Sequence, residues 1–384
     1  MANDLTGLYP TIYNAMNVVS REFVGLISAV SRDASAQQVA VNQTVRSPVV
    51  PAMAAAPITP GNIAASGTDQ TIDYVDIVID KQRKVTFNLT GEEERGLGPN
   101  NSSIAQQRFA QAFRTLGNEI EADLAALYVA ASRAAGTAGA NPFGTADDFT
   151  ALTAAMQILD DNGAPVTDRH AVLNSAAVAV LLGKQPSMFR VNEAGGDMER
   201  RFGQLRPLFN MELHHSGQIK SHIKGGMTGF DVNEAGHYAV GATTIAFDGG
   251  TVNSTGAKAG DVVTIGTDPN KYVIKTGSTS TSGSIVLNKP GLRVAAAHET
   301  EMVIGNSYAA NMVFSRDAIQ LACRVPAVPT GGDQASDRMI VTDPHTNISF
   351  EIAVYRQYRQ VTFEVAACWG KQAIKSDHLT LLMG

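Results

Sequence analysis

Histidine and glutamate residues gather in one stretch of the chain and could hold a metal ion. The stretch contains Glu212, His214, His215 and His222, and imidazole and carboxylate groups are ligands that zinc accepts. Adjacent residues of a strand point to opposite faces, so His214 and His215 cannot both bind one ion on a regular strand. We therefore interpret this stretch as a polar surface and expect no metal and no cofactor.

Other residue patterns that could support catalysis are weak. Residues 160–163 (Asp, Asp, Asn, Gly) resemble part of a calcium loop, but the glutamate that ends such a loop is absent, which favours a helix end and a turn. The sequence contains none of the patterns GxGxxG, GxxxxGK[ST], GxSxG, HExxH and CxxC, each of which marks a known cofactor or catalytic site. We expect no catalytic residues and no enzyme activity.

The composition indicates a globular protein with little charged surface. Charged residues make up 17% of the 384 residues, below the roughly 25% of an average soluble domain. A surface so poor in charge suggests extensive contacts with other copies of the chain. The net charge of -6 argues against tight sequence-specific binding of nucleic acid, which normally needs a basic face.

Three further features bear on the setting of the chain. The first ten residues lack the basic and apolar regions of a secretory signal, so we expect the chain to fold in a cytoplasm. No apolar run approaches the roughly 18–20 residues of a membrane span, so we expect no membrane. Cys323 and Cys368 lie apart in apolar, strand-like contexts, which favours two reduced core residues over a disulfide.

The elements that must position these residues begin with a helix and a hairpin. Apolar residues at helical spacing predict an amphipathic helix or arm within residues 1–30, with a stripe of Ile12, Met16, Val19, Phe23 and Ile27. The β-prone runs 43–50, 71–79 and 85–89 flank a segment rich in proline, which forbids a helix. Together they predict an extended hairpin whose tip, residues 51–69, needs a neighbour to become ordered.

Mixed structure is predicted for the rest of the chain. Helical spacing from Pro99 to a stop at Gly136 predicts one long strut helix, and a second helix is expected over 147–161. A strand at 170–174 and a short helix at 175–182 complete an α+β core. Glycine-rich turns alternate with β-runs at 261–265, 272–275 and 284–287, which predicts a separate all-β unit at 226–305.

The core is expected to resume after that unit. A strand at 311–314, a helical turn at 316–321 and two β-rich runs within 347–369 follow it. The unit at 226–305 is therefore predicted to be a domain inserted into another domain.

This order of parts resembles the major capsid protein of a tailed bacteriophage. The resemblance covers nearly the whole chain, and its most specific stretches are 311–319 (NMVFSRDAI), 367–370 (ACWG) with Ala373 and Ile374, 260–265 (GDVVTI), and the long helix ending near Ala135. The family has the Hong Kong 97-like capsid fold, and the resemblance is to short-tailed phages whose coat protein carries an inserted β-barrel. It implies an extension loop at about 44–90 and a spine helix at about 101–135.

The resemblance also implies a domain plan and a function. The plan is an N-terminal arm (1–43), an extended hairpin with the start of the peripheral domain (44–98), a spine helix (99–136), an axial and peripheral α+β core (137–225), an inserted β-domain (226–305) and a return to the core (306–384). Copies of the chain would form hexamers and pentamers of an icosahedral shell around double-stranded DNA, assembled in the host cytoplasm with scaffolding and portal proteins. Lys81 and Lys84 have no matching partner, so covalent crosslinking is not carried over.

The dense charge clusters lie on segments that the resemblance places at subunit edges. We expect contacts between subunits at these residues: Lys81, Arg83, Lys84, Glu92, Glu93, Glu94, Arg95, Arg200 and Arg201. A solvated loop is the alternative interpretation of the acidic run.

Two other classes of protein remain open. One is a surface-layer or other self-assembling lattice protein, which would need an export signal. The other is an α+β enzyme with the β-insertion as a lid, which would need a pocket with convergent titratable groups.

Overall fold

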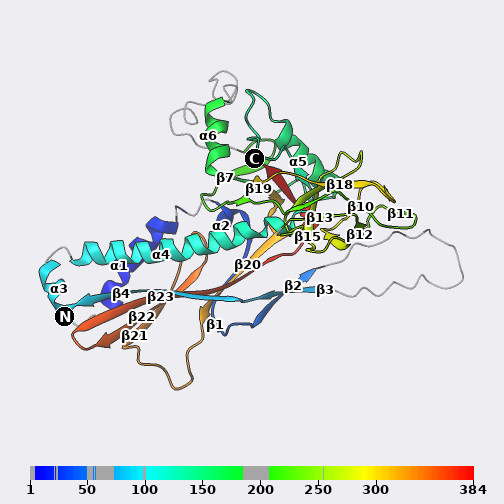
Figure 1. Ribbon diagram of the computed structural model, residues 1–384. Coiled ribbons are helices and arrows are strands. Elements are labelled where there is room, and N and C mark those ends of the chain that lie inside the picture. The colour runs from blue at the N-terminus through cyan, green and yellow to red at the C-terminus, as the bar shows by residue number, and fades with distance from the viewer. Residues whose placement is uncertain are drawn as a thin grey trace, which may run out of the picture.

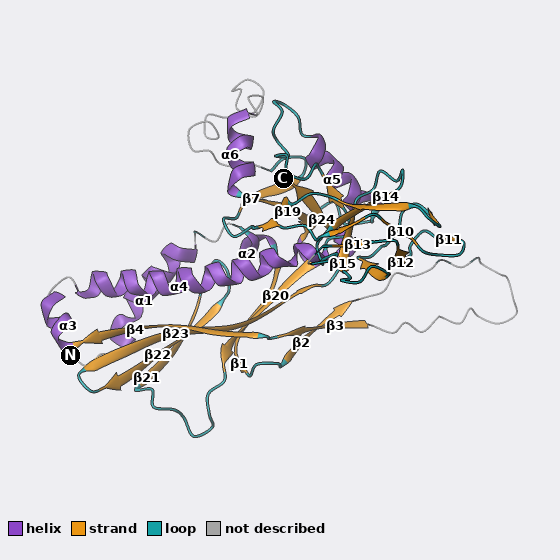
Figure 2. Cartoon of the chain, viewed as in Figure 1, coloured by secondary structure: helices purple, strands orange, loops and turns teal. Residues whose placement is uncertain are grey.

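The computed structural model describes residues 5–20, 22, 25–49, 55, 57, 73–97, 101–184, 207–253 and 255–384. These residues form a mixed α+β fold made mostly of strands. A long sheet with a helix lying along it forms an arm, a second sheet with two helices forms the upper part, and a barrel lies on the side away from the tip of the arm (Figures 1 and 2).

The arm is built around one long strand. Its strands, in spatial order, are β1 (Ser31–Val39), β20 (Ile319–Pro326), β23 (Gln360–Ala373), β22 (Ser349–Gln357) and β21 (Asp337–Thr342), with β4 (Lys81–Thr90) also paired with β23. One edge of β23 pairs with β22 over residues 360–366 and with β20 over 368–373, while β4 pairs along residues 360–369. The length of β23 thus joins two halves of the sheet.

Helix α4 (Asn101–Ala125) lies along this sheet and buries its apolar stripe. The rings of Phe87 on β4, Phe109 on α4 and Phe363 on β23 lie with centroids 5.0–5.5 Å apart, in the edge-on and offset arrangements that aromatic rings prefer. Helix α1 (Leu5–Ser20) packs on α4 through its own apolar residues, among them the buried Ile12 and Val19. The sheet, α4 and α1 therefore share one core.

The central strands of the second sheet are buried on both faces. Its strands are β5 (Ala134–Ala135), β24 (Leu379–Met383), β19 (Tyr308–Ser315), β6 (Arg169–Leu173) and β7 (Met211–His215), and β8 (Ser221–His222) pairs with β19. Alternate residues of β6 face different cores: Leu173 packs with α5 (Thr150–Asp161) and α6 (Ser175–Lys184), whereas Val172 faces the core that contains α4. This sheet links the upper helices to the arm.

The chain forms a closed barrel between β8 and β19. Its strands, in order around the barrel, are β10 (Phe230–Val232), β12 (Thr244–Asp248), β16 (Gly283–Leu287), β15 (Tyr272–Thr276), β14 (Val262–Ile265) and β18 (Glu301–Ile304). Two small ribbons lie beside it, β11 (His237–Tyr238) with β17 (Ala296–Ala297) and β9 (Met227–Thr228) with β13 (Thr251–Val252). Phe230, Ile245 and Met302 belong to a core cluster of the barrel's own.

The predicted hairpin is present. Strands β2 (Thr44–Val49) and β3 (Asp73–Val78) form an antiparallel two-stranded sheet that pairs with no other strand among the described residues, and it extends away from the arm in Figure 1. At its base the chain crosses β23 closely, because a Cβ atom at Gly370 would overlap the carbonyl of Val78. The proline-rich tip at residues 51–69 lies, apart from two residues, outside the described part of the chain.

Two predicted helices end earlier than the sequence indicates. The strut helix ends at Ala125, and a 3₁₀ turn (Ala126–Ala130) follows instead of helix to Gly136. Tertiary bonds take over there, because the Asn288 side chain donates to the carbonyls of Val129 and Ala131, and Ala134 joins β5. The N-terminal stripe is split between α1 and the short α2 (Leu26–Ala29); its Phe23 lies outside the described residues.

Smaller differences appear in the core. The segment predicted as a helical turn at 316–321 is a 3₁₀ turn only at Arg316–Ala318, and Ile319 already begins β20. Cys323 and Cys368 are free, as predicted. Burial raises the pKa of the Cys323 thiol to about 12 and that of Cys368 to about 11, so both remain protonated and unreactive at neutral pH.

Candidate assembly surfaces

The basic residues at the start of β4 are paired within the subunit. Lys81 Nζ lies 2.9 Å from Asp123 Oδ1, Arg83 Nε lies 2.8 Å from Glu119 Oε1, and Lys84 Nζ lies 2.9 Å from Glu364 Oε2. Asp123 and Glu119 belong to α4, and Glu364 belongs to β23. Lys81 and Arg83 therefore hold the start of β4 to the strut helix α4, and Lys84 holds it to β23, roles that the sequence analysis did not assign to them.

Asp123 is the centre of this group. Its carboxylate accepts hydrogen bonds from Lys81, from Trp369 Nε1 at 2.9 Å and from Lys371 at 3.0 Å. Burial alone would raise the pKa of Asp123, but these three donors outweigh it and lower the pKa. The carboxylate therefore stays ionised where β4, β23 and α4 meet.

The acidic run forms the short helix α3 (Gly91–Leu97) beyond β4. Glu93 and Thr90 make a reciprocal cap, in which the Glu93 amide donates to Thr90 Oγ1 and Glu93 Oε2 accepts from the Thr90 amide. Thr90, followed three residues later by Glu93, is a sequence signal for this cap that the analysis above did not use. Glu92, Glu94 and Arg95 are exposed, and none has an ion-pair partner among the described residues.

A groove lies beside this helix at the tip of the arm. Its volume is about 700 Å³. Residues of β4, α3, β22 and β23 line it, including Leu89, Glu92, Glu94, Tyr358 and Val361. Tyr358, in the turn between β22 and β23, is 89% exposed. The tip of the arm thus presents a concave surface with apolar and acidic side chains together with Arg356 and Arg359.

The hairpin is buried at its base, where Ile77 packs with Ala322 and Cys368, and one face of it is exposed further along. Tyr74 is 58% exposed and Val78 is 42% exposed. Arg46 and Asp76 form an exposed ion pair at 3.1 Å, and the guanidinium of Arg46 lies over the ring of Tyr74. An isolated two-stranded hairpin is only marginally stable in water, so this surface is suited to burial against another molecule.

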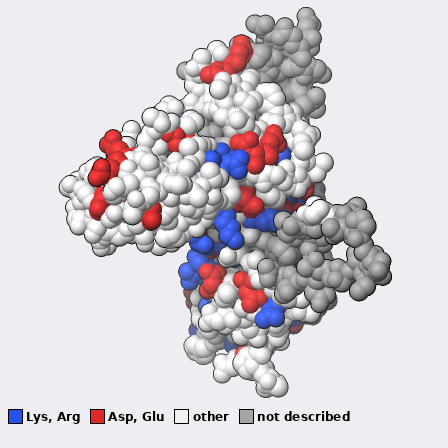
Figure 3. All heavy atoms as spheres, turned by 90° about the vertical axis from the view of Figure 1, so that its right-hand side faces the viewer, with Lys and Arg blue, Asp and Glu red and all other residues white. Residues whose placement is uncertain are grey.

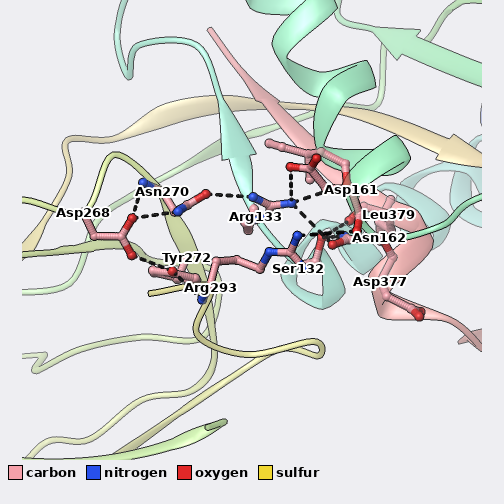
Figure 4. A network of polar contacts seen from close by, with 11 residues as sticks. Ser132, Arg133, Asp161, Asn162, Asp268, Asn270, Tyr272, Arg293, Asp377 and Leu379 are labelled. Atoms are coloured by element: carbon pink, nitrogen blue, oxygen red, sulfur yellow. Dashed lines mark hydrogen bonds and ion pairs between the residues drawn. The ribbon is translucent and has the colours of Figure 1, made fainter. Parts of the chain in front are cut away.

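A polar network joins the barrel to the upper part (Figure 4). Arg133 donates to Asn270 of the barrel at 2.7 Å and to Asp161 at the end of α5 at 3.2 Å. Asn270 in turn donates to Asp268, which also accepts from the hydroxyl of Tyr272. Because the side chain of Arg133 is only 4% exposed, these bonds fix the barrel against α5 in a setting that excludes water.

The histidines of the sequence cluster separate in the structure. His214 and His215 point to opposite faces of β7, as predicted, and His215 Nε2 lies 2.9 Å from Ser175 Oγ. His222 lies elsewhere, buried between Tyr128 and Asp261 with distances of 2.8 Å to each. Sequence reasoning missed His170, on β6. Its Nδ1 lies 2.9 Å from Nε2 of His214 on the paired strand β7.

Charge is sparse on the face that contains the barrel and the hairpin. Figure 3 shows this face, where uncharged residues predominate and the charged side chains form small groups.

Arg200 and Arg201, the remaining basic pair predicted at subunit contacts, lie outside the described residues. No helix in the described part of the chain has both the length and the apolarity of a transmembrane segment.

The fold is similar to that of solved capsids. The capsid of the cyanophage P-SCSP1u is 11% identical with a TM-score of 0.49, covering 93% of this chain and 87% of that chain. The mature capsid of bacteriophage PhiM1 is 11% identical with a TM-score of 0.43, covering 93% and 86%. A virus-like particle from Pyrococcus furiosus is 10% identical with a TM-score of 0.42, covering 97% and 98%.

No family model matches the chain, and no curated protein matches it. The TM-scores of these three solved structures lie below 0.5, so the function must be argued from the geometry of this chain. Phage capsids are among the structures to which the chain is similar.

Proposed function

We propose that this chain is a major capsid protein, copies of which assemble into an icosahedral shell around the double-stranded DNA of a tailed phage. One observation carries the proposal: the hairpin of β2 and β3 projects from the subunit and pairs with no other described strand. A two-stranded element that projects beyond its own core is marginally stable and gains stability when it packs against a neighbour. A shell supplies such a neighbour to every copy.

Within this proposal the fold is of the Hong Kong 97 type. The hairpin serves as the extension loop, α4 as the spine helix, and the two sheets as the peripheral and axial domains. Residues 226–305 are proposed to be an inserted all-β domain. This is supported by the pairing of the first barrel strand with the last, Phe230 with Met302, because the chain then enters and leaves the barrel at neighbouring strands.

The proposed partners follow from the same role. Copies of the chain form hexamers and pentamers, with scaffolding and portal proteins taking part in assembly in the host cytoplasm. The net charge of -6 is compatible with a shell that encloses DNA without binding it tightly. At the contacts between subunits we assign Glu92, Glu94 and Arg95 a larger part than Lys81, Arg83 and Lys84, whose charges are paired within the subunit.

Electron microscopy of the purified full chain, alone and with a co-expressed scaffolding protein, tests the proposal. We expect closed shells of uniform size. Planar sheets would identify a surface-layer type of lattice protein instead. Small uniform oligomers would favour an α+β enzyme with the β-insertion as a lid. Either of those outcomes overturns the proposal.

A further inference from the structure

Two histidines and a glutamate converge on one face of the second sheet. Strands β6 and β7 are parallel and place His170 beside Glu212 and Val172 beside His214. Glu212 and His214 are two residues apart on β7, so their side chains point to the same face. Their ligand atoms and that of His170 all lie within 4.8 Å of one another.

The spacing of the three atoms fits a small metal ion. His170 Nδ1 lies 2.9 Å from His214 Nε2 and 3.4 Å from Glu212 Oε2, and His214 Nε2 lies 3.7 Å from Glu212 Oε2. Ligands about 2.0–2.1 Å from a tetrahedral zinc ion lie about 3.3 Å from one another. The observed distances bracket that value, so a small adjustment of side chains would let all three atoms reach one ion.

The outer ring nitrogens of both histidines already have acceptors. His170 Nε2 lies 2.9 Å from Asp168 Oδ1, which assigns the proton to Nε2 and leaves the Nδ1 lone pair facing the other ligands. His214 Nδ1 lies 3.4 Å from Ser28 Oγ, whose own proton goes to the carbonyl of Gly25. A histidine that binds metal usually donates its other N–H in this way, which fixes the ring and its tautomer.

Asp168 is itself held in place. Arg316 Nε lies 2.8 Å from Asp168 Oδ2, and Arg316 Nη1 donates to the carbonyl of Ser28 at 3.1 Å. The support of both histidines is therefore one connected set of residues: Ser28 on α2, Asp168 directly before β6, and Arg316 in the turn after β19. Such an outer set of hydrogen-bond partners is expected around a metal site.

We propose that His170, Glu212 and His214 bind a divalent transition-metal ion, with zinc as the best fit to two imidazoles and one carboxylate. The His170 side chain is fully buried and that of His214 is 14% exposed, whereas Glu212 is 59% exposed. The ion would enter from the side of Glu212, where water supplies the fourth ligand. Bound there, it ties the edge strand β7 to β6. This differs from the absence of metal expected from the sequence.

Titration of the chelator-treated full chain with Zn²⁺ tests the site, with Co²⁺ absorption as a second readout. We expect one ion per chain and a melting temperature that rises with free Zn²⁺, because ligands that bind the native state stabilise it. His214→Ala should weaken binding by more than about 100-fold, and Asp168→Asn by about 10-fold to 100-fold. Glu212→Gln, at an exposed position, should also weaken it without affecting folding.

His215→Ala is the matched control, because His215 is the next residue on β7 and faces the other way. It should bind Zn²⁺ as tightly as the wild-type chain. Failure of the wild-type chain to bind one ion per chain would overturn the proposal. Equal affinity in the wild-type, His214→Ala and Glu212→Gln chains would also overturn it.

Discussion

Strands β3 and β4 follow one another directly in the sequence but differ in what covers them. Strand β4 lies in a sheet beneath α4, with Phe87 against Phe109 and Phe363 and with Lys81 bonded to Asp123. Strand β3 pairs only with β2, and Tyr74 stands 58% exposed on it. The chain thus passes within a few residues from a strand anchored along its length to one whose only fully buried described residue is Ile77, at its end nearest β4.

This difference separates two kinds of stability in one chain. Burial and ion pairing hold β4 in the free subunit, where apolar burial contributes about 25 cal/mol for each Å² removed from water. Beyond its base at Ile77, the described part of the hairpin has little such burial, so the free energy that orders this outer part must come from contacts between copies. Mutations in the two regions should therefore affect different measurements.

The largest effect is expected from Phe109→Ala, which removes the α4 ring from the group of three aromatic side chains. Phe109 is fully buried, and truncating a buried phenylalanine costs about 3–5 kcal/mol. Denaturant unfolding of the free subunit measures the loss. Tyr358→Ala, at an 89% exposed position, is the control and should change the free energy of unfolding by less than about 0.5 kcal/mol. Equal losses of unfolding free energy in both variants would contradict the claim that the β4 region is stabilised by burial within the subunit.

A smaller loss of subunit stability is expected from Asp123→Asn. Hydrogen bonds to charged groups contribute about 1.5–3 kcal/mol, and Asp123 accepts from Lys81, Trp369 and Lys371. Its pKa is lowered from the ordinary 3.8, so its contribution is present above that value and lost as pH falls through the lowered pKa. Unfolding of both chains across acid pH should show the wild-type advantage disappear there. An advantage independent of pH would contradict this.

Glu121, two residues earlier on α4, should show the opposite dependence on pH. It accepts hydrogen bonds from the amides of Leu26 and Ile27 at 2.6 and 3.1 Å, yet burial raises its pKa above the ordinary 4.5. The stability it contributes is therefore present at acid pH and lost as pH rises through the raised pKa. Relative to Glu121→Gln, the wild-type chain should lose free energy of unfolding as pH rises. A wild-type free energy of unfolding that rises with pH, relative to that of Glu121→Gln, would refute the assignment.

The hairpin should respond in assembly and not in the stability of the subunit. Tyr74→Ala is expected to change the free energy of unfolding of the free subunit by less than about 0.5 kcal/mol, while light scattering shows slower assembly. Tyr74→Phe keeps the apolar ring and should assemble as the wild-type chain does. A large drop in the melting temperature of Tyr74→Ala would mean that the hairpin is held by its own subunit.

The smallest effect is expected at the acidic tip of the arm. Glu92→Lys combined with Glu94→Lys leaves the Glu93 cap intact, and it should change subunit stability by less than about 1 kcal/mol. Assembly should slow at low salt and recover as salt screens the contact. Assembly at the wild-type rate at both low and moderate salt would support a solvated loop.

Local patterns predicted the elements better than their ends or their partners. The alternation of Val85, Phe87 and Leu89 predicted β4, but the spacing of Leu127 and Ala131 also predicted more helix than forms. There, Tyr128 bonds His222 and Asn288 bonds the backbone, and such long-range bonds are not visible in a helical pattern. The same limit hid His170, which meets His214 only because β6 and β7 pair in parallel.

Hydrogen exchange of the free subunit and of assembled particles tests the central claim most directly. The amides of β4 pair along β23 and should be protected in both states. Those of the outer part of β2 and β3, residues 46–49 and 73–76, should exchange quickly in the subunit and slowly in the particle. Equal protection of the hairpin in both states would contradict the account, because the hairpin would then gain nothing from its neighbours.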